Sequence, residues 1–340
     1  MEEELIPPRS RTDQIGRDAL ERQLRAAIGE GALTHGWILA GPEGSGKATL
    51  AYRIARALLD PSSLTDDTSL NMPETAKVFR HIAAGAHPDL FVAERLYDEK
   101  KDRHQSEITV ETIRKLTSFL SRTASGGGAR VAIVDTADDM NRNAANALLK
   151  ALEEPPEGAT LLLLSAAPGR LLPTIRSRCR RIDLAPVADD EIVQLLRTEG
   201  ASPGNAKNIA DHARGRPGYA LMLAAGEGAE AISLAQAFLQ TAQRGGDLSR
   251  IIAGVAGKAG DARWPIFRDT LIASLSDASR AAATHDAAQG FEGADAGDLL
   301  NAWQAVTALA GRGEALNLDR AQLLEAIAYD LRAALKRRAA

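Results

Sequence analysis

Cysteine is nearly absent from this chain, which has one thiol, Cys179, among its 340 residues. A single cysteine excludes an intramolecular disulfide and a cysteine-based zinc site. No histidine lies near it in the sequence to activate a thiolate, so a role as a nucleophile is disfavoured. This cysteine usage is typical of proteins of the reducing cytoplasm, and we expect a cytoplasmic location.

Long apolar runs are also missing, because no stretch reaches the roughly 20 residues that a membrane-spanning helix needs. The first residues, Met1-Glu2-Glu3-Glu4, are acidic where a signal peptide is basic, so neither a targeting segment nor a membrane partner is expected. The six histidines lack metal-ligand spacing, and no serine-histidine-aspartate pattern with a nucleophile elbow is present. We therefore predict no metal site built by the protein alone.

Aromatic residues make up only 4% of the chain, whereas the hydrophobic fraction is 45%. Together with abundant alanine and leucine, this balance is typical of a helix-rich soluble protein. The chain is longer than the size at which single hydrophobic cores stop growing, so two or three domains are expected. The formal net charge of −4 argues against a protein whose main task is to grip DNA.

A glycine-rich segment stands between an apolar run at 37–40 and an amphipathic pattern at 50–58. The run predicts a buried strand and the pattern predicts a helix. Three glycines let the backbone turn successive N–H groups inward, and Lys47 adds a full positive charge at the start of the helix. The predicted nucleotide-binding residues of this segment are Gly41, Pro42, Glu43, Gly44, Ser45, Gly46, Lys47, Ala48 and Thr49.

Two groups that support nucleotide hydrolysis are missing. Hydrolytic phosphate loops place Ser or Thr directly after the lysine to ligate Mg²⁺, but this chain has Ala48, and Thr49 is turned about 100° away. A strand over 130–134 ends in Asp135, whose carboxylate is expected beside the phosphates and their Mg²⁺. A catalytic glutamate does not follow it, since the next residue is Thr136. The pattern favours nucleotide binding and argues against hydrolysis.

Hydrophobic periodicity and turn residues predict the other elements of the first 186 residues. In chain order these are a helix around 20–28, a surface loop at 60–73, a strand entered at 87–92, a charged loop at 95–107, a helix at 108–120, a turn at 126–128, a helix around 145–152 stopped by Pro155-Pro156, and a strand at 161–164. After residue 186, short helices up to 226 have the size of a lid, and residues 227–340 are expected to be helical.

Some polar residues have two interpretations. Ser165 closes a core strand, either to contact a γ-phosphate or simply as a turn former. Four arginines between Arg176 and Arg181 form either a nucleic-acid-binding patch or a solvated face. Glu153 and Glu154 are adjacent on a helix and point about 100° apart, which favours a solvated pair over a catalytic acid and base.

Taken together, the chain resembles the δ′ subunits of the bacterial DNA polymerase III clamp loader, which are AAA+ proteins. The resemblance covers essentially the whole chain, although beyond residue 226 it is one of size and helicity. The segments that carry it are Gly41–Lys47, His87-Pro88-Asp89, Ile108–Arg114, Asn146–Pro156 and Ser177-Arg178-Cys179.

The resemblance implies a fold and a set of partners. The fold is an α/β AAA+ P-loop domain at 1–186, with a parallel sheet flanked by helices, then a helical lid at 187–226 and an all-α, collar-type oligomerisation domain at 227–340. The partners are the ATPase (γ/τ) subunits and the δ subunit of a heteropentamer, which loads the sliding clamp onto primed DNA.

It also implies roles for single residues. Arg178 corresponds to the arginine finger that reaches the ATP of a neighbouring subunit, a task suited to a planar guanidinium. The lid arginine of ATPase subunits aligns with Gly218, and Arg216 is two residues displaced. With Ala48 and Thr136, three hydrolytic elements are altered, so ATP or ADP is expected to bind, with Mg²⁺ accompanying it, but not to be hydrolysed. Relatives often carry a four-cysteine zinc module before the His-Pro-Asp segment, and this chain, without those cysteines, is expected to hold no zinc.

Two other functions stay in play. The intact loop Gly41–Lys47 and Asp135 support a catalytically active P-loop ATPase. The arginines at 176–181 support a DNA-binding module, whose affinity would fall steeply with salt.

Overall fold

The structure is a computed structural model of the whole chain. It describes all residues except 1–4, 32, 96, 99–102, 106, 125–127, 258–259, 261–262, 285, 287–290, 292–293, 316–317 and 336–340. The chain divides into two compact units, which we call the N-terminal unit (residues 4–221) and the C-terminal unit (residues 222–340). The three-domain division expected from the sequence stays a prediction.

A five-stranded parallel sheet forms the centre of the N-terminal unit. Its strands are β1 (Gly36–Ala40), β2 (Leu90–Ala93), β5 (Arg130–Val134), β6 (Ala159–Ser165) and β7 (Arg180–Asp183). They lie in the order β2-β5-β6-β1-β7, with each neighbouring pair parallel. Every residue of β1, β5 and β6 is buried, as continuous apolar strands covered on both faces should be.

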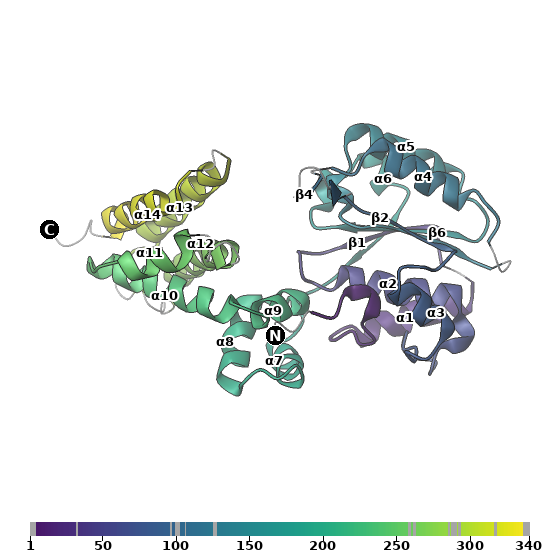
Figure 1. Ribbon diagram of the computed structural model, residues 1–340, viewed down its shortest axis with the longest axis horizontal. Coiled ribbons are helices and arrows are strands. Elements are labelled where there is room, and N and C mark those ends of the chain that lie inside the picture. The colour runs from purple at the N-terminus through teal and green to yellow at the C-terminus, as the bar shows by residue number, and fades with distance from the viewer. Residues whose placement is uncertain are drawn as a thin grey trace. The chain divides into compact units, whose positions relative to one another are not determined.

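Helices cover both faces of this sheet (Figure 1). On one side are α1 (Asp18–Gly29), α2 (Lys47–Leu59) and α3 (Lys77–Ala83); on the other are α4 (Val110–Leu120), α5 (Arg142–Glu153) and α6 (Pro173–Arg176). The Thr109 and Asn141 side chains cap α4 and α5 by accepting backbone N–H bonds. The predicted α/β domain with a parallel sheet flanked by helices is confirmed.

Several local predictions were wrong. The 60–73 segment is not wholly a surface loop, because Leu70 and Met72 are buried. The charged loop at 95–107 contains an antiparallel pair, β3 (Tyr97–Asp98) and β4 (Arg103–His104). Strand β7 and helix α3 were not predicted, since β7 is largely exposed and polar and α3 has only seven residues. Most of the turn predicted at 126–128 lies outside the described residues.

Helices make up the rest of the chain. The lid segment consists of α7 (Asp189–Thr198), α8 (Pro203–Ala213) and α9 (Pro217–Ala224). The C-terminal unit contains α10 (Gly228–Arg244), α11 (Ser249–Ala256), α12 (Arg263–Ala283), α13 (Ala296–Ala315) and α14 (Arg320–Leu335), which confirms the helical prediction. Its core includes an edge-to-face contact between Phe238 and Phe267, with Trp264 stacked on Phe267 as expected of a packing residue. None of the helices in the described ranges is long and apolar enough to cross a membrane.

Candidate nucleotide-binding site

The predicted strand, loop and helix are present at 36–59. The loop joins the carboxyl end of β1 to the first residue of α2, Lys47. Gly44 (φ +77°) and Gly46 (φ +91°) adopt left-handed conformations that side chains disfavour, so glycine is required at both positions. The free N–H groups at the start of α2 therefore face the loop and give it a partial positive charge suited to phosphate.

Lys47 and Asp135, both predicted to bind nucleotide, lie close enough for their charges to interact. The Lys47 ammonium donates to the carbonyl oxygens of Gly41 (2.7 Å) and Pro42 (2.9 Å). Burial lowers the pKa of Lys47, and the Asp135 carboxylate opposes that shift. Burial raises the pKa of Asp135, while Lys47 opposes it. Each charge therefore stabilises the other in a partly desolvated place where phosphate and a cation would gain strong electrostatic interactions.

Thr136 directly follows Asp135, at the position where a catalytic glutamate is missing from the sequence. Its backbone is left-handed, with φ +58°, a rare conformation for a β-branched residue. Its side chain and its backbone both hydrogen-bond Asp135, which opposes the rise that burial causes in the pKa of that carboxyl. Thr136 thus holds the Asp135 carboxylate by hydrogen bonds.

Two residues near Asp135 escaped prediction. Tyr52 of α2 has its pKa raised to about 12, first by burial and then by the Asp135 and Glu94 carboxylates. Glu94 directly follows β2, and β2 pairs with β5 so that Ala93 lies opposite Val134. The sequence signal for Glu94 was its position at the end of a strand. Only the strand order shows that this position lies next to Asp135.

Ser165, one candidate for a γ-phosphate contact, bonds within the chain. Its hydroxyl donates to Asp138 Oδ1 at 2.7 Å, and the Ala166 N–H donates to Asp138 Oδ2 at 2.6 Å. Asp138 lies in the 3₁₀ turn Ala137–Asp139, just after Asp135. The arrangement ties the end of β6 to the turn beyond β5, which agrees with the structural interpretation of this serine.

The lid lies directly on the phosphate loop. The Gly218 N–H donates to the Gly44 carbonyl oxygen at 2.8 Å. A Cβ on Gly218 would lie 3.1 Å from that oxygen, and a Cβ on Gly44 would lie 2.5 Å from the Tyr219 nitrogen. The Arg216 guanidinium sits 3.9 Å from the centre of the Tyr219 ring. Gly218, which aligns with the lid arginine of ATPase subunits, therefore contacts the loop, while the Arg216 guanidinium lies over Tyr219 of the same lid segment.

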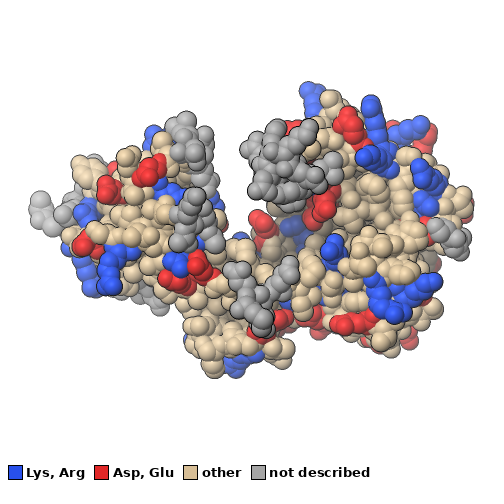
Figure 2. Space-filling view, viewed as in Figure 1, with Lys and Arg blue, Asp and Glu red and all other residues tan. Residues whose placement is uncertain are grey.

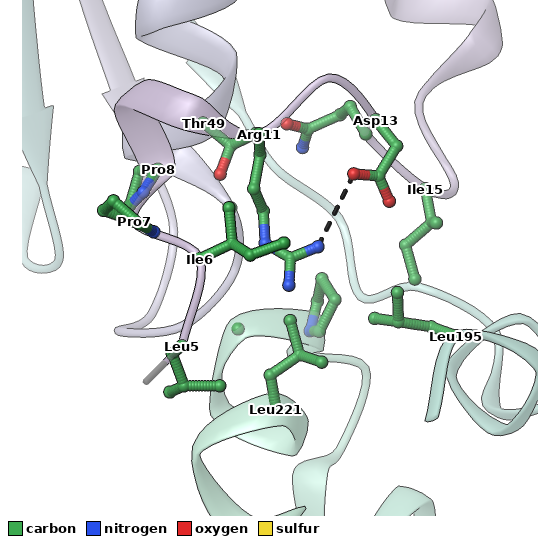
Figure 3. Close-up of a pocket in the computed structure, with 14 residues that line it drawn as sticks. Leu5, Ile6, Pro7, Pro8, Arg11, Asp13, Ile15, Thr49, Leu195 and Leu221 are labelled. Atoms are coloured by element: carbon green, nitrogen blue, oxygen red, sulfur yellow. Dashed lines mark hydrogen bonds and ion pairs between the residues drawn. The ribbon is translucent and has the colours of Figure 1, made fainter. Parts of the chain in front are cut away.

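An apolar cavity of about 350 Å³ continues from the loop (Figure 3). It is enclosed by the first residues of the N-terminal unit, by α2 and by the lid. Thr49 faces it, consistent with the expectation that this hydroxyl turns away from the phosphates. Its lining residues are Leu5, Ile6, Pro7, Pro8, Arg11, Asp13, Gln14, Ile15, Gly46, Thr49, Leu195, Pro217, Gly218 and Leu221.

The arginine-rich segment lies at the other edge of the sheet. Arg178 precedes β7, and a Cβ on Gly36, the first residue of β1, would lie 3.5 Å from the Arg178 carbonyl oxygen. The phosphate loop follows the last residue of β1, so the length of a five-residue strand, roughly 16 Å, separates them. The structure does not bring Arg178 together with Lys47 and Asp135.

The arginines at 176–181 form contacts within the chain. Arg180 stacks over the Trp37 ring at 5.0 Å, and Arg181 pairs with Asp183 at 2.6 Å. On the face drawn in Figure 2, basic and acidic side chains of the N-terminal unit are interspersed. These contacts favour a structural interpretation of the cluster over a nucleic-acid patch.

The comparison with known protein families shows which family the chain belongs to. Residues 16–188, half of the chain, match the family described as "DNA polymerase III, delta subunit". The chain belongs to this family. The match contains the phosphate loop, Asp135 and Ser177-Arg178-Cys179, and the parallel sheet agrees with the expected AAA+ class of this delta-subunit family.

Individual relatives of this delta-family chain are also polymerase subunits. "DNA polymerase III subunit delta'" of Pseudomonas aeruginosa is 42% identical over 191 residues, covering 52% of this chain and 55% of that protein. The Escherichia coli protein of the same name is 32% identical over 212 residues, covering 60% and 59%. "DNA polymerase III subunit gamma" of Buchnera aphidicola is 28% identical over 223 residues, covering 64% and 58%. The chain thus matches little more than half the length of these relatives.

No group of three or more His, Cys, Asp or Glu side chains within the described part of this family member is placed to hold a metal ion. The expectation that the chain holds no zinc stays a prediction.

Proposed function

We propose that this delta-family chain is the δ′-type subunit of a bacterial replicative clamp loader and supplies Arg178 to a neighbouring ATPase subunit. The observation that carries this proposal is the placement of Arg178 at the sheet edge opposite its own phosphate loop. A guanidinium there cannot reach a nucleotide bound by the same chain, but it can serve a nucleotide bound by a neighbour.

The local chemistry at the chain's own loop supports a non-hydrolytic role. Ala48 offers no hydroxyl to Mg²⁺, Thr136 bonds Asp135 in place of a base, and Gly218 provides no lid arginine. We propose that ATP or ADP binds with its phosphates over residues 41–48, with Mg²⁺ near Asp135, and its base in the apolar cavity. The cavity's apolar lining suits a planar aromatic base.

The partners follow from the family. Relatives named as delta', gamma and tau subunits support a ring that contains γ/τ ATPase subunits and a δ subunit. In this proposal the assembly works in the cytoplasm and loads a sliding clamp onto primed DNA, without a membrane partner.

Replacing Lys47 by alanine tests the nucleotide site. We expect the affinity of the purified chain for ATP or ADP to fall about 10- to 100-fold, the loss of charge-assisted hydrogen bonds worth about 1.5–3 kcal/mol. Isothermal titration calorimetry measures it. Lys207→Ala, at an exposed site on α8, is the matched control and should bind as the wild type does. Equal affinity of both variants would remove nucleotide binding from the proposal.

Steady-state hydrolysis tests the role of Arg178. We expect no turnover by the chain alone and strong turnover by a mixture with γ/τ, δ, clamp and primed DNA. Arg178→Ala should remove much of that stimulation without preventing assembly, whereas Arg176→Ala, an exposed neighbour, should not. An assembled ring indifferent to Arg178→Ala would contradict the proposal.

The active-ATPase alternative makes the opposite prediction. It is supported by the glycine-rich loop and by the shared site of Lys47 and Asp135. Substantial hydrolysis by the isolated chain, abolished by Lys47→Ala, would favour it. The DNA-binding alternative requires salt-sensitive binding of primed DNA by the isolated chain.

A further inference from the structure

The two most distinctive sequence motifs of this chain meet in space. Leu152 and Glu153 end α5, and Ser177-Arg178-Cys179 follows α6. A Cβ on Gly36 would lie 3.0 Å from Leu152 Cδ2 and 3.2 Å from Cys179 Sγ, so these side chains close tightly over the start of β1. Cys179 and the Arg178 carbonyl group are thereby packed against the start of β1, while the Arg178 side chain is exposed.

That side chain is turned back toward its own subunit. Arg178 Nη2 pairs with Glu153 Oε1 at 2.9 Å, and Nη1 donates to the Thr174 carbonyl oxygen at 3.0 Å. Nη1 also lies 3.4 Å from the Ser177 hydroxyl. Both terminal nitrogens of the guanidinium therefore have partners within the chain. Glu153 and Glu154 are both exposed, in agreement with the expected solvated pair, and the ion pair with Arg178 is an addition that the sequence did not predict.

The ion pair is positioned to open. The Arg178 and Glu153 side chains are 36% and 50% exposed. Exposed pairs of this kind contribute roughly 0–1 kcal/mol, which a phosphate group can outcompete through bidentate charge-assisted bonds. Water reaches both partners, so exchange of one acceptor for another involves no large desolvation.

We propose that Glu153 is a positioning residue that holds Arg178 folded back and restrains its delivery to the neighbouring nucleotide. The inference rests on the proposed function, because it matters only if Arg178 acts in trans. While the pair is closed, the carboxylate compensates the charge of the guanidinium. When a neighbour presents its γ-phosphate, Arg178 exchanges Glu153 for the phosphate oxygens. Glu153 thus limits the rate of ATP hydrolysis before the ring is correctly closed.

The adjacent glutamate provides a matched control. Glu154 is the C-cap residue of α5 and is exposed, with the same charge and nearly the same distance along the chain from Arg178. Comparison of Glu153→Gln with Glu154→Gln separates the ion pair from a general change in surface charge.

The test uses the full chain assembled with γ/τ and δ and measures ATP hydrolysis before clamp and primed DNA are added. We expect Glu153→Gln to raise this rate by up to about five-fold, the equilibrium worth of an exposed pair. Glu154→Gln should leave it unchanged. Combined with Arg178→Ala, Glu153→Gln should have no effect, a dependence that a merely structural role would not show.

Each result has a distinct meaning. If Arg178→Ala leaves stimulated hydrolysis intact, the proposed function fails. If Arg178→Ala lowers it but Glu153→Gln behaves as Glu154→Gln does, the restraint by Glu153 is overturned. A loss of hydrolysis with Glu153→Gln also overturns it, because Glu153 would then assist the finger. Glu153→Ala, measured in parallel with gel filtration of each complex, supplies a second variant for the same comparison.

Discussion

Arg53→Met is expected to lower the free energy of unfolding of the N-terminal unit by about 3–5 kcal/mol. The Arg53 guanidinium is buried and pairs with both oxygens of Glu21, at 2.6 Å and 2.7 Å. It also donates to the Thr12 carbonyl oxygen and to Asn71 Oδ1 at 2.8 Å. Methionine fills similar space but leaves the buried Glu21 carboxylate without its cation. The first thermal transition should fall by roughly 6–20 °C, as measured by calorimetry.

Two variants test the cause of that loss. Arg25→Met removes an ion pair with the fully exposed Asp67, at 3.4 Å, and a hydrogen bond to the Asp66 carbonyl oxygen, at 3.2 Å, and should change stability by about 1 kcal/mol. The double variant Arg53→Met/Glu21→Leu should be less destabilised than Arg53→Met alone, because it leaves no uncompensated charge. If Arg53→Met is as stable as Arg25→Met, the buried pair does not hold this part of the fold together.

Gly44→Ala should destabilise the same unit by about 2–5 kcal/mol and displace the lid. A left-handed alanine costs about 1–2 kcal/mol, and forcing atoms into a filled space costs about 1–3 kcal/mol more. Gly44 incurs both terms, because its φ is +77° and a Cβ would lie 2.5 Å from the backbone nitrogen of Tyr219. Thermal unfolding measures the loss, and hydrogen exchange at Gly218 reports whether its bond to Gly44 opens.

Gly31→Ala is the control for backbone strain. Gly31 has φ +64°, but a Cβ there would meet nothing within 4 Å. We expect it to lose only about 1–2 kcal/mol and to leave exchange at Gly218 unchanged. Equal losses in the two variants would show that the contact with the lid adds nothing.

Prediction from the sequence succeeded where one residue's neighbours along the chain decide its structure. The loop at Gly41–Lys47 could be predicted because the patterns of a buried strand and an amphipathic helix flank it, and both elements are present. Asp135 directly follows β5, as expected, because its apolar run marks a buried strand of a parallel sheet. The apolar faces of α1, α4 and α5 could likewise be predicted from hydrophobic periodicity.

It failed where partners come from distant segments. Strand β7 offers Arg180 and Arg181 to solvent, so no apolar pattern marked it, and only its pairing with β1 makes it a strand. The role of Arg53 depends on Glu21 and on the loop that carries Asn71, which hydrophobic periodicity cannot connect. The contact of Glu153 with Arg178 arises from the meeting of two helix ends, and it was invisible to local spacing.

The sheet gives this subunit a direction. Its carboxyl edge carries the phosphate loop, and its amino edge carries Arg178. If Arg178 serves a neighbour, as we propose, the surface around Arg178 contacts one neighbouring subunit and the surface around the phosphate loop contacts another, which is a head-to-tail arrangement. If this chain does not hydrolyse its own nucleotide while Arg178 acts on the nucleotide of one neighbouring subunit, only the contact on the Arg178 side affects hydrolysis. A ring that contains this chain would then have a defined first and last ATPase subunit, and the order in which the subunits hydrolyse ATP could be numbered from this chain.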